Sequence, residues 1–335
     1  MFKSSSLFIS ALVLCFTLLV SGCGANNSDT KNTADKPGTN ADSSAANNAT
    51  GNKQDNGQEA QTRKITDARG EIEVPAKPAR VVVLHNGALD DLLALGVKPV
   101  GAPSIVSVNA SFPAYLPGTD GISNIGTVDQ PSLEAVQALK PDLIIGIKAS
   151  HEAIYDKLSQ IAPTVFVETL GETWKDNLRI HADAVGLSEK GKELLAVYDE
   201  RTQQLKKAIG DRIAETEISL FRPRDNGIQI YLTKPFAAGI LADSGLPRPE
   251  AQREDAFSRN ITEESIADLD GDAIFWFSRD TAYFEEKVEK SPLWATLKAV
   301  QGKKVYHVDW ETWMSGNGIQ AANKVIDDLF THLGQ

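Results

Sequence analysis

Two arginines interrupt an apolar segment in the second half of the chain, and their spacing raises the possibility of an anion site. Residues 219–231, SLFRPRDNGIQIY, predict two short strands with a turn between them, and Arg222 and Arg224 lie near the end of the first strand. Side chains two residues apart in a strand point to one face. In a chain of net charge −11, they indicate either one wall of an anion site or a solvated strand edge. Pro223 between them favours a strand end or an edge strand over a central strand.

Other side chains that could contact a ligand follow strand ends or lie in loops. His85 follows RVVVL (80–84) and Lys148 follows DLIIGI (142–147), so both are expected beyond the carboxyl ends of strands. Arg179 lies on a helix that begins near Trp174. Solvated surface charge or core packing is the alternative for each candidate. The full set of predicted ligand contacts is Arg222, Arg224, His85, Lys148, Arg179, Tyr231, Trp310 and Trp313.

Three more residues are assigned other roles. Trp276 lies within the predicted strand DAIFWF (272–277), which favours core packing. His151 is a candidate helix cap. For Arg248, which follows ADSGLP, a structural role is favoured over a ligand contact.

Several kinds of chemistry find no support in the sequence. The five histidines, at 85, 151, 181, 307 and 332, show no paired ligand spacing, which argues against a zinc or manganese receptor. G-x-S-x-G, H-E-x-x-H and Walker motifs are absent, so we expect no enzymatic activity, and we expect no cofactor. The chain has no basic surplus that would indicate nucleic-acid binding.

The first residues predict export and attachment to a membrane. Residues 1–22 carry Lys3 and an apolar run from Leu7 to Val20, the length of a signal peptide core. The run closes with Val20-Ser-Gly-Cys23, so Cys23 is the predicted lipid anchor; the alternative is an ordinary signal with a chance cysteine. Residues 24–62 contain no Ile, Leu, Val, Met or aromatic residue, so 23–62 is predicted to be a disordered tether with a reach of roughly 35 Å.

Strand-like runs alternate with amphipathic stretches from residue 63 onward, which predicts an α/β fold with largely parallel sheets. Residues 187–210 form a long predicted helix, with Ser188 as a plausible N-cap and Gly210 as its stop. It is either one more packed helix or a strut that joins an N-terminal lobe (63–186) to a C-terminal lobe (211–335).

An internal repeat favours two equivalent lobes. PSLEAVQALKPDLIIG, from Pro131, matches ITEESIADLDGDAIFW, from Ile261, at a constant offset of 130 residues. Each copy predicts an N-cap, a short helix, a tight turn and a strand. Glu134 and Glu264 occupy matching positions in the first helical turn, where a carboxylate suits the helix dipole. Such residues also remain free to contact a partner.

These segments together resemble the bacterial ABC-transporter substrate-binding lipoproteins of the iron-siderophore and cobalamin class. The resemblance rests on the lipobox, KPARVVVL, PSLEAVQALKPDLIIG, LSQIAPTVFV, GILADSGLPRPEAQ and KVYHVDWETWMSGNGIQAANKVIDDL, in this order. It implies two Rossmann-like lobes joined by a single long helix, with the ligand in a cleft between the lobes. It also implies a monomer that is lipid-anchored on the extracytoplasmic face of a Gram-positive cell membrane.

The resemblance further implies partners. In this family one glutamate from each lobe docks on an ABC permease of the FecCD type, which works with its ATPase, and Glu134 and Glu264 fall on those positions. The ligand is expected to be a ferric siderophore, with the iron held inside the chelator. The arginine pair favours an anionic chelate of the citrate, carboxylate or hydroxamate type. A cobalamin or haem receptor is the alternative, which would favour aromatic walls or an axial histidine.

Overall fold

The structure is a computed structural model that describes residues 61–105, 112–225 and 227–334. The predicted signal peptide, Cys23 and all but the last residues of the tether lie outside these ranges. Within them, no helix combines the length and the apolar character needed to cross a membrane.

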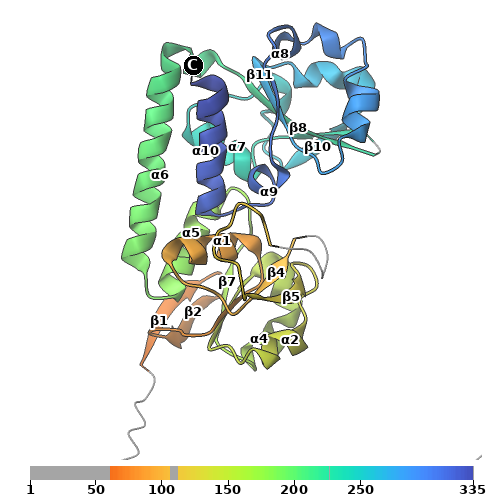
Figure 1. Cartoon of the computed structure of the whole chain (residues 1–335). Coiled ribbons are helices and arrows are strands. Elements are labelled where there is room, and N and C mark those ends of the chain that lie inside the picture. Colours follow the sequence, from red (N-terminus) through yellow and green to blue (C-terminus); the bar gives the residue numbers. More distant parts are fainter. Residues whose placement is uncertain (1–60, 106–111, 226, 335) are drawn as a thin grey trace, which may run out of the picture. The chain divides into compact units, whose positions relative to one another are not determined.

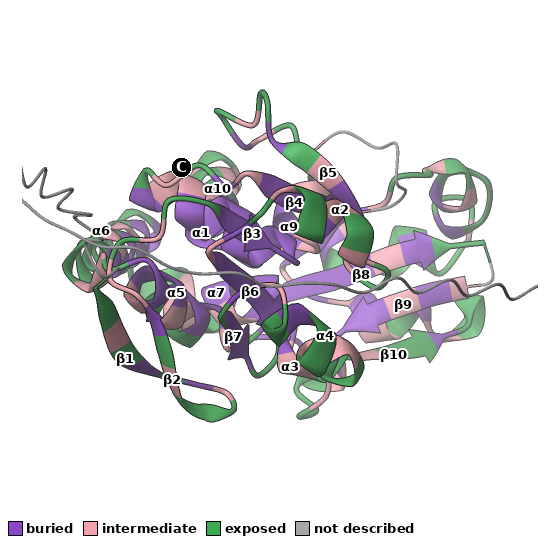
Figure 2. Cartoon of the chain, turned by 90° about the horizontal axis from the view of Figure 1, so that it is seen from below, coloured by how far each residue is buried: buried purple, intermediate pink, exposed green. Residues whose placement is uncertain are grey.

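The N-terminal lobe is built on a parallel sheet. Its five strands, in spatial order, are β5 (Ser123–Thr127), β4 (Gly101–Ser104), β3 (Val81–Val83), β6 (Leu143–Ile147) and β7 (Thr164–Val167). The strands β3 and β6 are buried along their whole length, as a sheet covered on both faces requires (Figure 2). A separate antiparallel hairpin of β1 (Thr62–Asp67) and β2 (Gly70–Pro75) precedes this sheet.

The C-terminal lobe repeats this strand order. Its sheet runs β10 (Ser258–Ile261), β9 (Gly227–Tyr231), β8 (Ile218–Arg224), β11 (Ala273–Trp276) and β12 (Val305–His307). In both lobes the first strand is central, the next two lie on one side and the last two on the other. The prediction of two related α/β lobes is therefore confirmed.

The lobes differ after the first strand. In the N-terminal lobe β3 leads into helix α1 (Asn86–Leu95), whereas β8 turns directly into the antiparallel β9. The predicted hairpin over 219–231 is thus confirmed, but the inference from Pro223 was only half right, because β8 is the central strand of its sheet. Pairing of β8 with β11 ends at Phe221, so Pro223 lies at the strand end, where only β9 pairs with it.

The matched aspartates of the repeat have the same task in both lobes. Asp142 accepts hydrogen bonds from the backbone N–H groups of Ala79 (2.7 Å) and Arg80 (2.8 Å), just before β3. Asp272 accepts one from Glu217 N–H (2.8 Å), just before β8. Each carboxylate therefore ties the start of the fourth strand to the start of the first.

The helices of the repeat are less alike than the sequence predicted. Ser132 caps α2 (Leu133–Ala138) by accepting a hydrogen bond from Ala135 N–H (3.2 Å). The second copy is a 3₁₀ helix, η4 (Glu263–Leu269), and Thr262 donates to the Glu264 carboxylate (2.7 Å) instead of capping it.

The predicted long helix is α6 (Ser188–Ile209), and it is both a connection and a packed element. It lies against α5 (Trp174–Ala184) and the C-terminal helix α10 (Ile319–Leu333), beside which it runs in Figure 1. Helix α10 also packs on α1 of the N-terminal lobe. One hydrophobic core consequently continues from the N-terminal sheet through α5, α6 and α10 to the C-terminal sheet.

The outer face of each sheet has its own smaller core, formed with short helices. The remaining helical segments are α3 (Lys148–His151), η1 (Glu152–Ile154), α4 (Tyr155–Ser159), η2 (Gly210–Glu215), α7 (Phe236–Asp243), η3 (Glu250–Gln252), the π-helical turn η5 (Phe284–Val288), η6 (Trp294–Thr296), α8 (Lys298–Gln301) and α9 (Trp310–Trp313).

Candidate functional site: an arginine-lined cavity

Three arginines line a cavity at the carboxyl end of the C-terminal sheet. Arg222 and Arg224 come from the end of β8, and Arg279 comes from the loop that follows the neighbouring strand β11. The cavity has a volume of about 460 Å³. It is lined by Arg222, Pro223, Arg224, Asp225, Ser278, Arg279 and Asp280. This is the edge at which open α/β sheets bind ligands.

Strand alternation explains why two of these arginines share the cavity. Ile218 and Leu220 face the core shared by the two lobes, whereas Phe221 faces the outer core of its own lobe. Arg222 and Arg224 continue the first row beyond the last core residue. The prediction that they share one face at a strand end is confirmed.

Trp310, the first residue of α9, lies against two of these arginines and lines the adjoining cavity. The Arg279 guanidinium carbon lies 4.3 Å from the centre of its ring, and that of Arg222 lies 5.7 Å away. Both distances are within the range of cation–π attraction, which contributes about 0.5–2 kcal/mol per pair. Trp310 Nε1 and Arg222 Nε are buried without a hydrogen-bond partner in the described part of the chain, so two donors remain free to bind a ligand.

Two further cavities follow from this one, each sharing residues with the cavity before it. A cavity of about 410 Å³ has Ser278 and Arg279 in common with it and extends over Trp310 to Glu311. The next, of about 500 Å³, includes Glu311 and is lined from both lobes, with Ala114 and Tyr115 on the N-terminal side. The arginine cavity thus lies at one end of a series of cavities that reaches the other lobe.

Residues of β9, the second strand of the hairpin, lie beside the arginines. Gln229 stands opposite Arg222, and its Oε1 accepts hydrogen bonds from Arg224 Nη1 (3.2 Å) and Tyr231 Oη (3.1 Å). Burial raises the pKa of Tyr231, and the positive charges of Arg222 and Arg224 oppose the shift. Tyr231 therefore stays a neutral hydroxyl behind the arginines.

Arg248 has a structural place, as favoured from the sequence. Its buried guanidinium donates to the Tyr231 carbonyl (2.6 Å) and to the Gln252 side chain, which in turn accepts from Leu220 N–H (3.0 Å). Burial lowers the pKa of Arg248 to about 9. This network joins β8 and β9 just before the arginines emerge.

The balance of charge in the cavity is positive. Two carboxylates, Asp225 and Asp280, lie among three guanidinium groups. Across the described residues, no carboxylate is within ion-pair distance of Arg222 or Arg224, and Arg279 has only Glu311 at 3.9 Å. Guanidinium groups without carboxylate partners can each bind an oxyanion in bidentate fashion.

Two of the three N-terminal candidates, His85 and Lys148, do not line this cavity. His85 is fully buried and caps α1, because its Nδ1 accepts a hydrogen bond from Ala88 N–H (3.2 Å). Burial, reinforced by the nearby His181, lowers the pKa of His85 well below its usual value. Lys148 donates to the Glu168 carboxylate (3.1 Å) and the Ala68 carbonyl (3.2 Å). Their predicted ligand contacts stay predictions without geometric support.

Two other candidates are placed away from the cavity. Arg179 is exposed on α5 and pairs with Asp176. Trp313 is buried, stacks on Phe275 with ring centres 4.9 Å apart, and donates its indole N–H to Asp328 (2.7 Å). Trp310 and Trp313, expected in a loop, begin and end one helical turn; Trp310 lines the cavity of about 410 Å³ next to the arginine cavity, whereas Trp313 is in the core.

The remaining assignments divide between core and surface. Trp276 is in the core, as predicted, and stacks on Phe284. His151 is buried and accepts a hydrogen bond from Ile147 N–H (3.0 Å). Glu134 and Glu264 are both exposed. Within the described ranges, no three His, Cys, Asp or Glu side chains gather as metal ligands.

Sequence reasoning missed Arg279. It lies three residues after β11 in the segment DAIFWFSRD, so the strand-end rule that selected His85 and Lys148 would also have selected it. What the sequence lacked was the strand order, which places the end of β11 next to the end of β8.

A two-lobed α/β fold with a cavity beyond the sheet edge is the architecture of a substrate-binding protein. The chain belongs to the periplasmic binding protein family, whose model matches residues 81–312. Members of this family bind substrates, which confirms the prediction that the chain is not an enzyme.

Individual relatives refine this placement. The chain is 40% identical over 287 residues to a probable siderophore-binding lipoprotein of Bacillus subtilis, YfiY, covering 82% of this chain and 88% of the relative. It is 28% identical over 339 residues to the Fe(3+)-citrate-binding protein YfmC of the same organism, covering 98% of this chain and 97% of the relative. The crystal structure of Staphylococcus aureus SirA complexed with staphyloferrin B matches with a TM-score of 0.73 at 31% identity, over 81% of this chain and 98% of SirA.

Proposed function

We propose that this chain is an extracytoplasmic receptor that captures an anionic ferric siderophore and delivers it to an ABC permease for iron uptake. The observation that carries the proposal is the convergence of Arg222, Arg224 and Arg279 on one cavity beside Trp310. The names of the relatives support it, since they bind siderophores, ferric citrate or ferric hydroxamates. They do not favour the alternative of a cobalamin or haem receptor.

The chemistry of the cavity suits a chelate whose outer surface carries carboxylate or hydroxamate oxygen atoms. A hydrogen bond between ionised partners contributes about 1.5–3 kcal/mol, and a guanidinium can form two to one carboxylate. The buried Nε of Arg222 and Nε1 of Trp310 supply two further donors. The protein contacts the chelator, and the iron is part of the cargo.

A titration with chelates of different chemistry tests the proposal. Ferric citrate, ferric staphyloferrin B, a ferric trihydroxamate and a ferric catecholate are added to the protein, and tryptophan fluorescence is followed. We expect quenching by the carboxylate or hydroxamate complexes at submicromolar concentration. Quenching by cobalamin or haem, with no response to any siderophore, would contradict the proposal.

Arginine variants localise the binding. Arg222→Ala combined with Arg224→Ala should weaken binding by several kcal/mol, that is by a hundredfold or more, if both guanidinium groups contact the ligand. Arg179→Ala is the matched control, because Arg179 is an exposed arginine of the other lobe that pairs with Asp176. A loss of binding free energy smaller than about 0.5 kcal/mol in the double variant would show that the two arginines are ordinary surface charges.

Delivery requires the protein to remain near its permease. We propose that Cys23 carries the lipid anchor and that Glu134 and Glu264, one exposed carboxylate on each lobe, dock on the permease. Cys23→Ala should release the protein from the membrane fraction into the medium without changing its affinity for the chelate. Retention of the variant in the membrane fraction would argue for another mode of attachment.

A further inference from the structure

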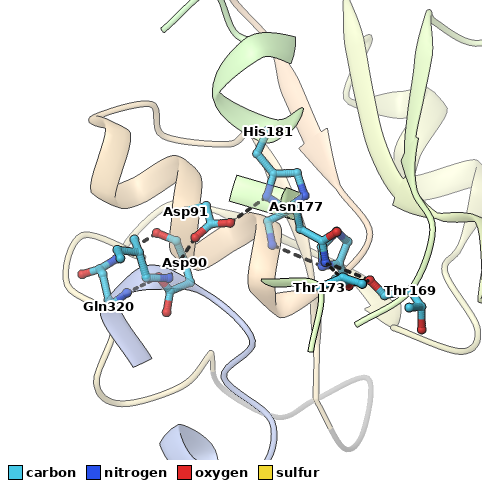
Figure 3. A network of polar contacts seen from close by, with 10 residues as sticks. Asp90, Asp91, Thr169, Thr173, Asn177, His181 and Gln320 are labelled. Atoms are coloured by element: carbon cyan, nitrogen blue, oxygen red, sulfur yellow. Dashed lines mark hydrogen bonds and ion pairs between the residues drawn. The ribbon is translucent and has the colours of Figure 1, made fainter. Parts of the chain in front are cut away.

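Two adjacent aspartates of the N-terminal lobe hold the first turn of the C-terminal helix. Asp90 and Asp91 are fully buried on α1. Asp91 Oδ1 accepts from Ile319 N–H (2.9 Å), Asp90 Oδ1 from Gln320 N–H (2.7 Å), and Asp90 Oδ2 from Ala321 N–H (2.9 Å). Three of the four N–H groups that a helix start leaves unpaired are thus bound by the other lobe. Figure 3 shows this contact, with Gln320 facing Asp90.

The contact is tight as well as polar. A Cβ atom on Gly318 would come within 2.5 Å of the Asp90 side chain, and one on Gly87 within 2.5 Å of the Asn317 carbonyl oxygen. Asn317 has a left-handed backbone, with φ at 56°, and its side chain accepts from Gly171 N–H (2.9 Å). Only glycine at positions 87 and 318 lets the two backbones approach this closely, so the segment has little freedom to move.

A second series of contacts leads from Asp90 to the arginine cavity. Asp90 Oδ2 accepts a hydrogen bond from Tyr115 Oη (3.0 Å). The preceding residue, Ala114, donates its N–H to Glu311 Oε2 (2.9 Å). Glu311 Oε1 lies 3.9 Å from Arg279 Nη2, and Arg279 covers the ring of Trp310. Tyr115 and Glu311 also line the same interlobe cavity.

We propose that Asp90 is a positioning residue for the ligand site, which acts through Tyr115 and Glu311 on Arg279. The single carboxylate of Asp90 accepts hydrogen bonds from Tyr115 and from the start of α10. It therefore fixes the position of both segments of chain that meet at Glu311. The Arg279 guanidinium can contact the Glu311 carboxylate, the Trp310 ring or a bound anion. The position of Glu311 then determines the balance between these three contacts. The N-terminal lobe thereby tunes the affinity of a cavity that it does not line.

This inference rests on the proposed function for the chemistry of the ligand. The series of contacts from Asp90 through Tyr115 and Glu311 to Arg279, which we call the relay, is independent of any ligand. If Asp90 only stabilised the fold, removing the Tyr115 hydroxyl would lower stability and leave Arg279 and Trp310 as they are. If it positions the cavity, the same change would alter both. The two possibilities therefore predict different fluorescence emission from Trp310 in the Tyr115 variant.

Tyr115→Phe is the minimal perturbation, because it removes one hydroxyl group and keeps the ring. The matched control is Asp67→Asn, a buried carboxylate of the same lobe that accepts N–H groups from Arg69 (2.7 Å) and Phe166 (2.8 Å) and makes no contact with Asp90. Two measurements are made on the full chain. One is the affinity for ferric citrate and ferric staphyloferrin B. The other is the emission of Trp310, isolated by subtracting the spectrum of a Trp310→Phe partner.

We expect Tyr115→Phe to weaken chelate binding about three- to tenfold, the range for one lost hydrogen bond. We also expect it to shift the Trp310 emission before any ligand is added. Asp67→Asn should lower the melting temperature without either effect. Wild-type affinity in Tyr115→Phe would overturn the inference, whatever the emission does.

A double-mutant cycle tests the path of the relay. Arg279→Met removes the charge that Glu311 contacts, so the losses in affinity from Tyr115→Phe and Arg279→Met should not add. The losses from Asp67→Asn and Arg279→Met should add. Additive losses for the first pair would overturn the relay.

The proposed function and the inference fail in different ways. If no chelate binds the wild type, the proposed function fails, and the emission then decides alone. A shift of the Trp310 emission in Tyr115→Phe upholds the relay, and an unshifted spectrum overturns it.

Discussion

The buried cap of α1 gives a pH dependence whose sign and size follow from the structure. His85 accepts a hydrogen bond from Ala88 N–H through Nδ1, so it must be neutral in the folded protein, and burial keeps its pKa well below 6.5. In the unfolded chain the pKa returns to about 6.5. Below that pH the unfolded state binds one more proton, so the free energy of unfolding falls as the pH falls.

His85→Asn removes this titration while keeping a cap, because asparagine is a strong N-cap residue. The wild type should lose about 2 kcal/mol more unfolding free energy than the variant between pH 7.5 and 5.0, from about 1.4 kcal/mol per pH unit below the unfolded pKa. The titrations of Asp90 and Asp91 occur in both proteins and largely cancel in this difference.

Urea denaturation at a series of pH values measures the effect. Between pH 7.5 and 9 the two stability curves should run parallel, which serves as the internal control because His85 is neutral there in both states. Curves that remain parallel down to pH 5.0 would refute the reasoning. They would mean that His85 keeps its usual pKa in the folded protein.

Three further predictions concern packing and docking. Trp313→Phe removes a buried indole N–H and should cost about 1–3 kcal/mol of unfolding free energy in urea denaturation, with unchanged chelate affinity; weakened binding would place Trp313 at the ligand. Gly318→Ala forces a Cβ against Asp90 and should cost about 1–3 kcal/mol by overpacking, and an unchanged denaturation midpoint would show that the interlobe contact is loose. Glu134→Ala combined with Glu264→Ala should abolish iron uptake by cells while the purified protein binds chelate normally, whereas a parallel loss of affinity would contradict the docking role.

Local sequence pattern was sufficient for the part of the site that lies on one hairpin. The period of two in a strand placed Arg222 and Arg224 on one face, and the turn after them marked the strand end. The same reasoning misjudged Pro223, because strand order is decided by packing and the proline lies just past the last residue that pairs with β11. Trp310 and Trp313 looked equivalent as loop residues, and only the three-dimensional packing of α9 separates them.

The interlobe relay was beyond the reach of sequence reasoning for a physical reason. Asp90 and Asp91 read as the polar part of an amphipathic helix, and SGNGIQ reads as a loop before a helix. Nothing local marks these carboxylates as buried, because three of their partners are backbone N–H groups, which every sequence has, and the side-chain partners, Tyr115 and His181, are distant in the sequence. The three-dimensional structure reveals the contact through the hydrogen bonds to α10 and the close approach of Gly87 to Asn317 and of Gly318 to Asp90.

The hydrogen bond between Asp90 and Gln320 joins residues that are 230 positions apart in the sequence. A chain made from its N-terminus produces both buried aspartates early and their backbone donors in α10 almost last. Tyr115 and His181 of the same lobe contact one oxygen of each aspartate, but until α10 arrives the two Oδ1 atoms can be satisfied only by water, and burying them unpaired is costly. A chain that stops before Ile319 leaves two buried carboxylate oxygens without a partner, so we expect such a chain to be less stable and more exposed to proteolysis than the full chain.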